Sequence, residues 1–396
     1  MSPTKKVFTY IGAILILILL LTGWTLFFLS RRNDTKNNPE LHGDMGRNWH
    51  NQPAPLRAGP KRCTAQDYIC CHAETGPNPS EKGLKLVIDH DGGADDALAI
   101  TMSILFEKYF NGPKIAALTT TYGNINQSQA IVNSARILKL CNRSDIPIYA
   151  GAKHALISGI ESDFFFGFDG LGDDGYVAME PIAIESVNAA VGLINLSKKY
   201  EGDLVIMAIG PLTNIALAIT MDPDFIGRLS QLYVGAGHIY SESFPEPEFN
   251  AAMDPEAYYI LADNARVDKV TIIPYSQVYV SLNATKKWRV NVLGAIDSPI
   301  IKALNGYERV SLASPGRVWS LLDPAVAAMA LDNSIIKEYR NTDNGIILCG
   351  DKRGVNTNNF TSKNPNSRLV YTAFVKKYKK FLFDVYSASS CSIKHS

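Results

Sequence analysis

The chain has 396 residues, 46% of them apolar, which is enough to bury one large core or two moderate ones. Its positive and negative side chains almost cancel, to a formal charge of +1, so it has no overall field that would attract nucleic acid. This composition excludes a disordered protein and argues against a nucleic-acid-binding one. It favours a small-molecule partner.

An uninterrupted apolar segment, VFTYIGAILILILLLTGWTLFFL, occupies residues 7–29. It carries no charge and is long enough to cross the roughly 30 Å hydrocarbon core of a bilayer as a helix. A cleaved signal peptide is the alternative, but such peptides have shorter apolar cores and a small-residue cleavage site, which this segment lacks. We therefore expect a transmembrane anchor at residues 7–29, preceded by a short cytoplasmic tail at residues 1–6.

Basic residues flank this segment on both sides, so the rest of the chain must indicate on which side of the membrane it lies. All six cysteines and several Asn-x-Ser/Thr sequences follow the anchor, as is typical of an oxidising, glycosylating compartment. We expect a single-pass membrane protein with disulfide bonds, N-glycans and an extracellular or lumenal body. The candidate glycosylation sites are Asn126, Asn142, Asn195, Asn283 and Asn359.

Residues 30–80 are rich in Asn, Pro, Gly and charge and lack periodic apolar positions, which indicates a stalk. Within residues 81–396, short apolar runs such as LKLVID and DLVIMA end in polar residues or glycine, and helix-like stretches follow them. This pattern of βα units predicts an α/β domain with a mainly parallel, doubly wound sheet. Polar residues that follow its strands should meet at one edge, where such sheets bind ligands.

Four carboxylates fall within LVIDHDGGADDALAI, which is predicted to form a buried strand, a glycine turn and the start of a helix: Asp89, Asp91, Asp95 and Asp96. Their repulsion in a partly desolvated crevice would destabilise the fold unless a cation lay among them. Calcium and magnesium both bind carboxylate oxygens of this kind. The alternative, that the carboxylates only cap the helix, accounts for one or two of them but not for four.

The order D-x-D-x-G-x-D-D resembles the signature of the inosine-uridine-preferring nucleoside hydrolases. Family-like segments follow in the same order, namely YGN, FFGFDGLGD, AIGPLTNIALA, EFNAAMDPEA and LLDPAVAAMA. The resemblance extends from Leu84 to the C-terminal region. It implies the nucleoside hydrolase fold and calcium-dependent hydrolysis of the N-glycosidic bond of ribonucleosides, to free base and ribose.

The resemblance also implies roles for individual residues. A bound cation acidifies water, and hydroxyl-binding groups orient the sugar above it. By resemblance, Ca²⁺ would be bound by the carboxylates of Asp91, Asp96 and Asp323 and by the backbone carbonyl of Ile209. Asp91 would take a proton from the metal-bound water. The residues that would bind the ribose are Asp95, Asn124, Glu248, Asn250 and Asp323.

Two positions depart from the family pattern. Leu322 stands where a His commonly protonates the departing base, and Glu242 stands where an Asn usually meets the ribose 5′-hydroxyl. Without that acid, a purine, which ring protonation and stacking can help, should be cleaved faster than a pyrimidine.

Several side chains could replace the missing acid by stacking on the base or protonating it. Trp319, for example, precedes Asp323 by four residues, one turn of a helix. Each candidate also has a structural explanation, as a packed aromatic ring or a hydrogen-bonded side chain. The candidates are Phe166, Phe168, Tyr307, Trp319 and His238.

Two other functions remain open. A nucleoside- or ribose-binding protein of the same fold would keep the calcium and ribose residues but lack turnover. A phosphatase of the haloacid dehalogenase type would use Asp89 and Asp91 with a divalent ion, but Gly93 stands where that family usually has Thr or Val. The expected partners are a nucleoside and a membrane, but no nucleic acid. A homo-oligomer is left open.

Overall fold

The structure, a computed structural model, describes residues 83–175 and 182–390, so the tail, anchor and stalk predicted at residues 1–6, 7–29 and 30–80 lie outside it. Within the described ranges, no helix combines the length and the apolar character that crossing a bilayer requires. Two of the six cysteines, Cys141 and Cys349, are described, and both are free. The other four lie outside the described ranges, so the disulfide bonds stay a prediction.

A nine-stranded sheet forms the centre of the domain, in the order β10-β9-β11-β6-β5-β4-β1-β2-β3. Strands β1 to β6 and β11 pair in parallel, whereas β9 and β10 are antiparallel to their neighbours at one edge. The mainly parallel sheet predicted from the sequence is therefore confirmed. The strands are β1 (Lys85–His90), β2 (Lys114–Thr120), β3 (Ile148–Ala150), β4 (Leu204–Ala208), β5 (Gln231–Val234), β6 (Val270–Ile272), β9 (Ile336–Ile346), β10 (Asn356–Asn359) and β11 (Ser367–Ala373).

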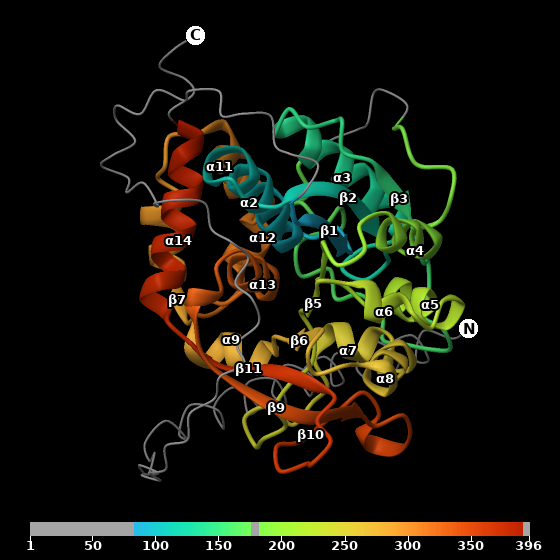
Figure 1. Ribbon diagram of the computed structural model, residues 1–396. Helices are drawn as coiled ribbons and strands as arrows, with labels where there is room; N and C mark the ends of the chain where they lie inside the picture. Colours follow the sequence, from blue (N-terminus) through green and yellow to red (C-terminus); the bar gives the residue numbers. More distant parts are fainter. Residues whose placement is uncertain (1–82, 176–181, 391–396) are drawn as a thin grey trace, which may run out of the picture. The chain divides into compact units, whose positions relative to one another are not determined.

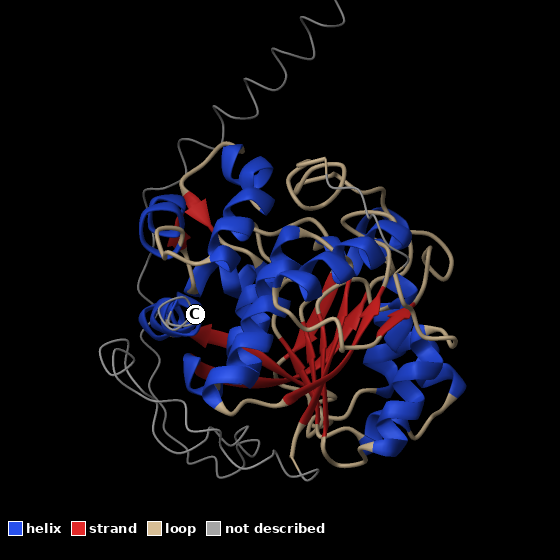
Figure 2. Ribbon diagram, turned by 90° about the horizontal axis from the view of Figure 1, so that it is seen from above, coloured by secondary structure: helices blue, strands red, loops and turns tan. Residues whose placement is uncertain are grey.

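Alternate side chains of a strand point to opposite faces of the sheet, and both faces are covered by helices (Figures 1 and 2). In β1, Leu86 and Ile88 join one buried cluster and Val87 joins the other. The first cluster includes α2 (Ala94–Phe110), α3 (Gln127–Leu140), α9 (Tyr275–Ser281), α11 (Pro299–Tyr307), α13 (Leu322–Leu331) and α14 (Val375–Ser387). The second includes α4 (Ala189–Lys199), α5 (Thr213–Met221), α6 (Phe225–Arg228), α7 (Phe249–Met253) and α8 (Pro255–Asn264).

The remaining short elements lie between α9 and α13 or near the antiparallel edge of the sheet. The antiparallel pair β7 (Ala284–Thr285) and β8 (Val318–Trp319) stands apart from the main sheet. The others are α10 (Lys286–Trp288), the π-helix η2 (Arg289–Leu293), α12 (Arg309–Ala313), and the 3₁₀-helices η3 (Asn333–Ile335) and η4 (Gly350–Lys352).

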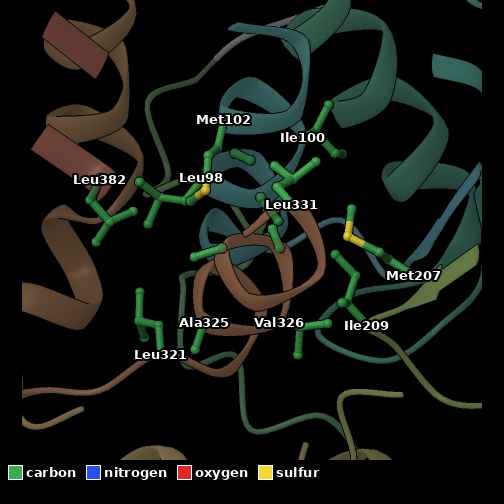
Figure 3. Packing of buried hydrophobic residues seen from close by; sticks show 14 of the residues in the cluster. Leu98, Ile100, Met102, Met207, Ile209, Leu321, Ala325, Val326, Leu331 and Leu382 are labelled. Carbon is green, nitrogen blue, oxygen red and sulfur yellow. The ribbon is translucent and has the colours of Figure 1, made fainter. Parts of the chain in front are cut away.

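Helix α13 is buried along its whole length, with all ten of its residues inside the domain. A helix that is apolar all round must be covered on every side. Figure 3 shows Val326 and Leu331 of α13 in one buried cluster with Leu98 of α2, Leu382 of α14 and Met207 of β4. This packing fixes the start of α13, which carries Leu322 and Asp323, at the carboxyl end of the sheet.

Strand β1 pairs with β2 on one side and with β4 on the other. The chain therefore adds β2 and β3 in one direction and then crosses β1 to add β4, β5 and β6 in the other. The loops after β1 and β4 separate at this point, which is where open α/β sheets bind ligands. The fold thus directs the polar residues that follow the central strands toward one region.

Candidate active site

A pocket of about 300 Å³ lies at the carboxyl ends of the central parallel strands. This volume is at the lower end of the usual range for small-molecule sites. No Lys or Arg is among the described residues that line the pocket. Those residues are Asp91, Asp95, Asn124, Asp163, Phe165, Phe166, Ile209, His238, Pro247, Glu248, Phe249, Asn250, Tyr275, Ser320, Leu321, Leu322 and Asp323.

The turn between β1 and α2 supplies the first carboxylates of the pocket. Gly92 has a φ of +85°, and a Cβ there would lie 2.8 Å from the Cα of Ala130, so glycine suits both the conformation and the space. Asp96 caps α2, because its carboxylate accepts hydrogen bonds from the backbone N–H groups of Gly93, at 2.6 Å, and Asp91, at 3.3 Å. Helix capping therefore accounts for the orientation of Asp96.

Asp89 does not join the carboxylates of the pocket, although the sequence placed it in the same acidic run. It is fully buried within β1. Its Oδ1 accepts hydrogen bonds from Thr119 Oγ1, at 2.6 Å, and Asn214 Nδ2, at 2.8 Å. Burial raises the pKa of Asp89 to about 7. This residue links β1 to β2 and to the start of α5.

Asp95, Asp96 and Asp323 form a compact cluster, in which one carboxylate oxygen from each residue lies within 4.8 Å of the others. Asp96 and Asp323 are buried and Asp95 is half-buried. Burial raises the pKa of each of the three, and the charges of neighbouring carboxylates raise it further. Such a cluster either retains protons or binds a cation.

The described residues supply no positive charge for this cluster. Among the described residues, no Lys or Arg pairs with Asp95, Asp96 or Asp323. The His90 Nδ1 lies 3.9 Å from Asp96 Oδ1, but burial lowers the pKa of His90 to about 3, so the ring is neutral. Asp95 Oδ1 is buried without a hydrogen-bond partner. These oxygen donors fit a hard divalent cation such as Ca²⁺.

Only part of the predicted calcium ligand set lies in this cluster. The Oδ2 of Asp91 accepts a 2.7 Å hydrogen bond from the backbone N–H of Asn124, and burial raises the pKa of Asp91 to about 6. The carbonyl oxygen of Ile209 accepts a 3.1 Å hydrogen bond from Asn250 Nδ2. Asp91 and Ile209 line the same pocket but are not members of the cluster. Asp95, which was expected to bind the ribose, belongs to the cluster with Asp96 and Asp323.

The residues expected to bind the ribose line the pocket together. Asn124 Oδ1 is buried without a hydrogen-bond partner, so it is available to a ligand donor. The Oε2 of Glu248 accepts hydrogen bonds from the N–H groups of Gly237, at 2.8 Å, and Ala251, at 3.1 Å, and burial raises the pKa of Glu248 to about 7. Asn250 also donates to the Gly235 carbonyl, at 2.9 Å. These hydrogen bonds hold the side chains of Glu248 and Asn250 in fixed positions.

Comparison with known proteins identifies the family. Residues 86–380 match the family described as Inosine-uridine preferring nucleoside hydrolase. The chain belongs to this family. Over 184 residues it is 35% identical to Uridine nucleosidase 1 of Arabidopsis thaliana, an alignment that covers 44% of this chain and 52% of that protein. Over 262 residues it is 24% identical to the Inosine-uridine preferring nucleoside hydrolase of Leishmania major, covering 65% of this chain and 81% of that protein.

Solved nucleoside hydrolase structures have the same fold. The structure titled Plant nucleoside hydrolase, the PpNRh1 enzyme, superposes with a TM-score of 0.70 at 26% identity and covers 77% of this chain and 99% of that one. The coverage of curated sequences is smaller, since the chain spans little more than half the length of relatives such as the Arabidopsis protein. Family membership therefore rests on the match across residues 86–380.

Two of the five side chains predicted to contact the base, Phe166 and His238, line the pocket of this nucleoside hydrolase family member. Phe168 does not line it and is 77% exposed. Tyr307 and Trp319 do not line it either. The Arg136 guanidinium lies over the Tyr307 ring, 4.5 Å from its centroid.

The prediction for Trp319 assumed that a helix extends back from Asp323. Helix α13 begins only at Leu322, and Trp319 belongs to β8. Its indole N–H donates a 2.6 Å hydrogen bond to Oε1 of Glu308. The other carboxylate oxygen of Glu308, Oε2, forms a buried ion pair with Arg289. The side chain of Trp319 is therefore buried, held by Glu308, and does not line the pocket.

The backbone of His238 is held by two asparagines of β10. Its N–H donates to Asn356 Oδ1 at 3.0 Å, and its carbonyl accepts from Asn358 Nδ2 at 3.3 Å. The ring packs between Phe244 and Tyr275, and burial lowers the pKa of His238 to about 4. The imidazole is therefore fixed and neutral near pH 7. Glu242 lies in an exposed turn and does not line the pocket.

Sequence reasoning missed three polar residues of the pocket, namely Asp163, Tyr275 and Ser320. Tyr275 follows β6, so the rule applied to the other strand ends could have found it. Asp163 directly precedes the run of phenylalanines at 164–166. Ser320 has a buried hydroxyl without a hydrogen-bond partner, and no sequence signal indicates it.

Proposed function

We propose that this chain hydrolyses the N-glycosidic bond of ribonucleosides, so that a nucleoside and water yield a free base and ribose. The observation that supports this best is a single pocket to which Asp91, Asp95, Asn124, Glu248, Asn250 and Asp323 all contribute. Membership of the nucleoside hydrolase family supports the same reaction. So do the names of the Arabidopsis and Leishmania relatives.

The proposed cofactor is Ca²⁺. The carboxylates of Asp91, Asp96 and Asp323 and the carbonyl of Ile209 would hold it. Asp95 lies in the same cluster of oxygens, and calcium accepts many oxygen ligands in flexible geometry. When bound, calcium supplies charge that neutralises the buried carboxylates and acidifies water in the pocket.

Asp91 is the proposed base. Burial raises the pKa of its carboxyl to about 6, so it can accept a proton near neutral pH. The N–H of Asn124 holds one of its oxygens. Asp91 takes a proton from the water that attacks C1′, while the bond between C1′ and the base breaks and its electron pair leaves with the base.

Asp95, Asn124, Glu248, Asn250 and Asp323 are proposed to hold the sugar hydroxyls. A sugar held at several hydroxyls keeps C1′ facing Asp91, and this orientation lowers the entropic part of the barrier. The hydrogen bonds that fix Glu248 and Asn250 support this role, because the groups need not reorganise when the substrate binds.

A preference for purines is the finer part of the proposal. It rests on Leu322, which lines the pocket and cannot protonate a departing base. Purines can be protonated on the ring by solvent, whereas a pyrimidine would have to leave as an anion. The Arabidopsis relative is named for uridine and gives this preference no support.

The same feature supports the alternative function. A chain that keeps the calcium and ribose residues but lacks a leaving-group acid would bind nucleosides without turnover, as a nucleoside- or ribose-binding protein. Binding and hydrolysis must therefore be measured separately.

The test is to incubate the purified full-length chain with inosine, adenosine and uridine and to follow free ribose and bound nucleoside. We expect ribose release with calcium, loss of release in excess chelator and recovery when calcium is restored. Asp91→Asn should reduce turnover by about 10²-fold or more, as loss of a general base does. The melting temperature of this variant checks that it folds.

The outcomes separate the proposals. Full activity in excess chelator contradicts the calcium dependence, and unchanged turnover in Asp91→Asn contradicts the assigned base. Nucleoside binding without ribose release from any substrate would establish the binding protein instead.

A further inference from the structure

Asp163, Phe165 and Phe166 form one wall of the pocket, and the adjacent Ser162 ties this segment to the floor. Ser162 Oγ donates a 2.5 Å hydrogen bond to the carbonyl of Asn124, a predicted ribose ligand. The N–H of Phe165 donates a 3.0 Å hydrogen bond to Asp163 Oδ1. These two bonds hold the Asp163 carboxylate at the side of the pocket that also carries Phe165 and Phe166.

Asp163 brings an uncompensated negative charge to this wall. Within the described part of the chain, no Lys or Arg forms an ion pair with it. Its charge also reaches Asp91, where it adds to the rise in pKa caused by burial. Whatever group of the substrate lies against this wall therefore experiences a fixed negative potential.

The chemistry of the wall indicates which part of a nucleoside lies there. The rings of Phe165 and Phe166 are 4.9 Å apart in an edge-to-face arrangement, and they give this side an aromatic surface. A flat heterocyclic base suits such a surface, whereas the carboxylates and amides of the floor suit sugar hydroxyls. The base of a bound nucleoside would thus lie beside Asp163.

We propose that Asp163 is a specificity-determining residue that favours purine nucleosides by stabilising positive charge on the base before it departs. The inference rests on the proposed hydrolysis and deepens it. A proton from solvent adds to N7 of the purine and makes the bound base cationic. The C1′–N9 bond then breaks, its electron pair goes to N9, and a neutral purine leaves. The Asp163 carboxylate, beside the base, lowers the energy of the cation.

The same charge opposes the departure of an anion. Uracil leaves with its electron pair on N1, and p-nitrophenol leaves p-nitrophenyl β-D-riboside as the phenolate. Both groups become negative beside Asp163, and like charges repel. One residue therefore has effects of opposite sign on purines and on anionic leaving groups, which a purely structural role would not produce.

The test compares kcat/KM for inosine, uridine and p-nitrophenyl β-D-riboside between the full-length wild type and Asp163→Asn. Asparagine keeps the shape of the side chain and an oxygen that can accept the Phe165 N–H. A charge interaction across a few ångströms near a protein surface changes rates by about tenfold. We expect inosine cleavage to fall about tenfold while cleavage of the other two substrates is unchanged or rises. Glu161→Gln is the matched control, because this exposed carboxylate is two residues away and outside the pocket.

Salt provides a second measurement that needs no variant. Raising the ionic strength screens an exposed charge, so the inosine-to-uridine ratio of the wild type should fall. Equal changes for all three substrates in Asp163→Asn, or no change in any, would overturn the inference. A wild type that hydrolyses none of the three substrates contradicts the proposed function instead, so the two failures are distinguishable.

Discussion

At the scale of single residues, the carboxyl groups on the floor of the pocket are crowded and buried, whereas the one on its wall is exposed. Asp95, Asp96 and Asp323 are packed so closely that burial and mutual repulsion raise their pKa values, and a cation relieves that repulsion. Asp163 is exposed, and no described Lys or Arg forms an ion pair with it. The floor is therefore suited to bind a metal ion, and the wall to act on the substrate.

Leu322 is the residue at which a leaving-group acid can be restored. It lines the pocket as the first residue of α13, next to Asp323, and it is 6% exposed. We expect Leu322→His to raise uridine cleavage more than inosine cleavage, because a general acid typically contributes about 10²–10⁴-fold and uracil, unlike a purine, leaves as an anion when no acid protonates it. The measurement is kcat/KM for both nucleosides.

Leu322→Gln is the control, since it adds polarity without an acid and should not raise uridine cleavage. If the wild type already cleaves uridine as fast as inosine, another acid serves the site. His238 and Tyr275, both in the pocket, would then be the next residues to change.

The sequence predicted the site residues that lie at strand ends and helix starts better than those that lie in loops. Asp91, Asp95, Asn124, Glu248 and Asn250 all follow strands or begin helices at one edge of the sheet, so the pattern of apolar runs predicts that they meet there. Their choice as site residues came from the family resemblance. Trp319 was misplaced because the spacing argument needed a helix that begins only at Leu322. The directions of the side chains of Ser320 and Asp163 depend on loops, whose conformation no periodicity encodes.

At the scale of elements, two supports hold the pocket from outside. On one side, β10 (Asn356–Asn359, sequence NTNN) pairs with β9 and holds both sides of the His238 peptide through Asn356 and Asn358. Its polar sequence carries no strand pattern, so pairing with β9 forms this strand, and the sequence could not predict it. On the other side, Asn133 of α3 holds the loop that follows Asp163.

Asn133 joins the acidic turn to the aromatic loop. Its Nδ2 donates to the carbonyls of Gly92, at 2.8 Å, and Asp169, at 2.7 Å, and the side chain is buried. Asn133→Asp removes both donors, and each buried acceptor left unpaired costs about 1–3 kcal/mol. We expect faster hydrogen exchange across residues 163–174 and a rise in KM that exceeds the fall in kcat, because the aromatic rings of the wall contact the base in the ground and transition states alike.

The control for Asn133→Asp is Gln129→Ala, which removes a donor to Asn133 Oδ1 but leaves both carbonyl contacts in place. A general loss of stability would alter exchange throughout the domain. Exchange in residues 163–174 that stays as slow as in the wild type would show that the loop does not depend on Asn133.

At the scale of the whole molecule, a nearly neutral chain carries a strongly acidic pocket. The formal charge of +1 does not predict the acidic pocket, because net charge is a sum over the whole chain and the pocket contributes only a few groups to it. The mainly parallel sheet was predictable because its strands are buried on both faces and appear as continuous apolar runs. Phosphorylated nucleosides should bind poorly, because the phosphate would meet several carboxylates and no Lys or Arg is among the described residues that line the pocket.

The N-glycosylation sites indicate on which side of the membrane this domain lies. We propose that residues 7–29 anchor the chain and that the body faces the lumen or the exterior, where calcium is plentiful. Within the described residues, the five candidate Asn-x-Ser/Thr asparagines are all exposed, so packing excludes a glycan from none of these five. Asn126 and Asn359 already accept backbone hydrogen bonds, from Gln129 and Thr361, which leaves Asn142, Asn195 and Asn283 as the sites we expect to be used first.

Enzymatic removal of N-glycans from the chain expressed in animal cells should increase its gel mobility, and changing Asn142, Asn195 and Asn283 together to Gln should remove most of that shift. Protease added outside intact cells should digest the body if it reaches the cell surface. If it remains in an internal membrane, digestion should require permeabilisation, and the glycan shift should persist. A body that carries no glycan and resists protease in intact cells, but is digested once the plasma membrane alone is permeabilised, would lie in the cytosol. The calcium site would then have to fill from the much lower calcium concentration there, so this outcome would also count against Ca²⁺ as the resident ion.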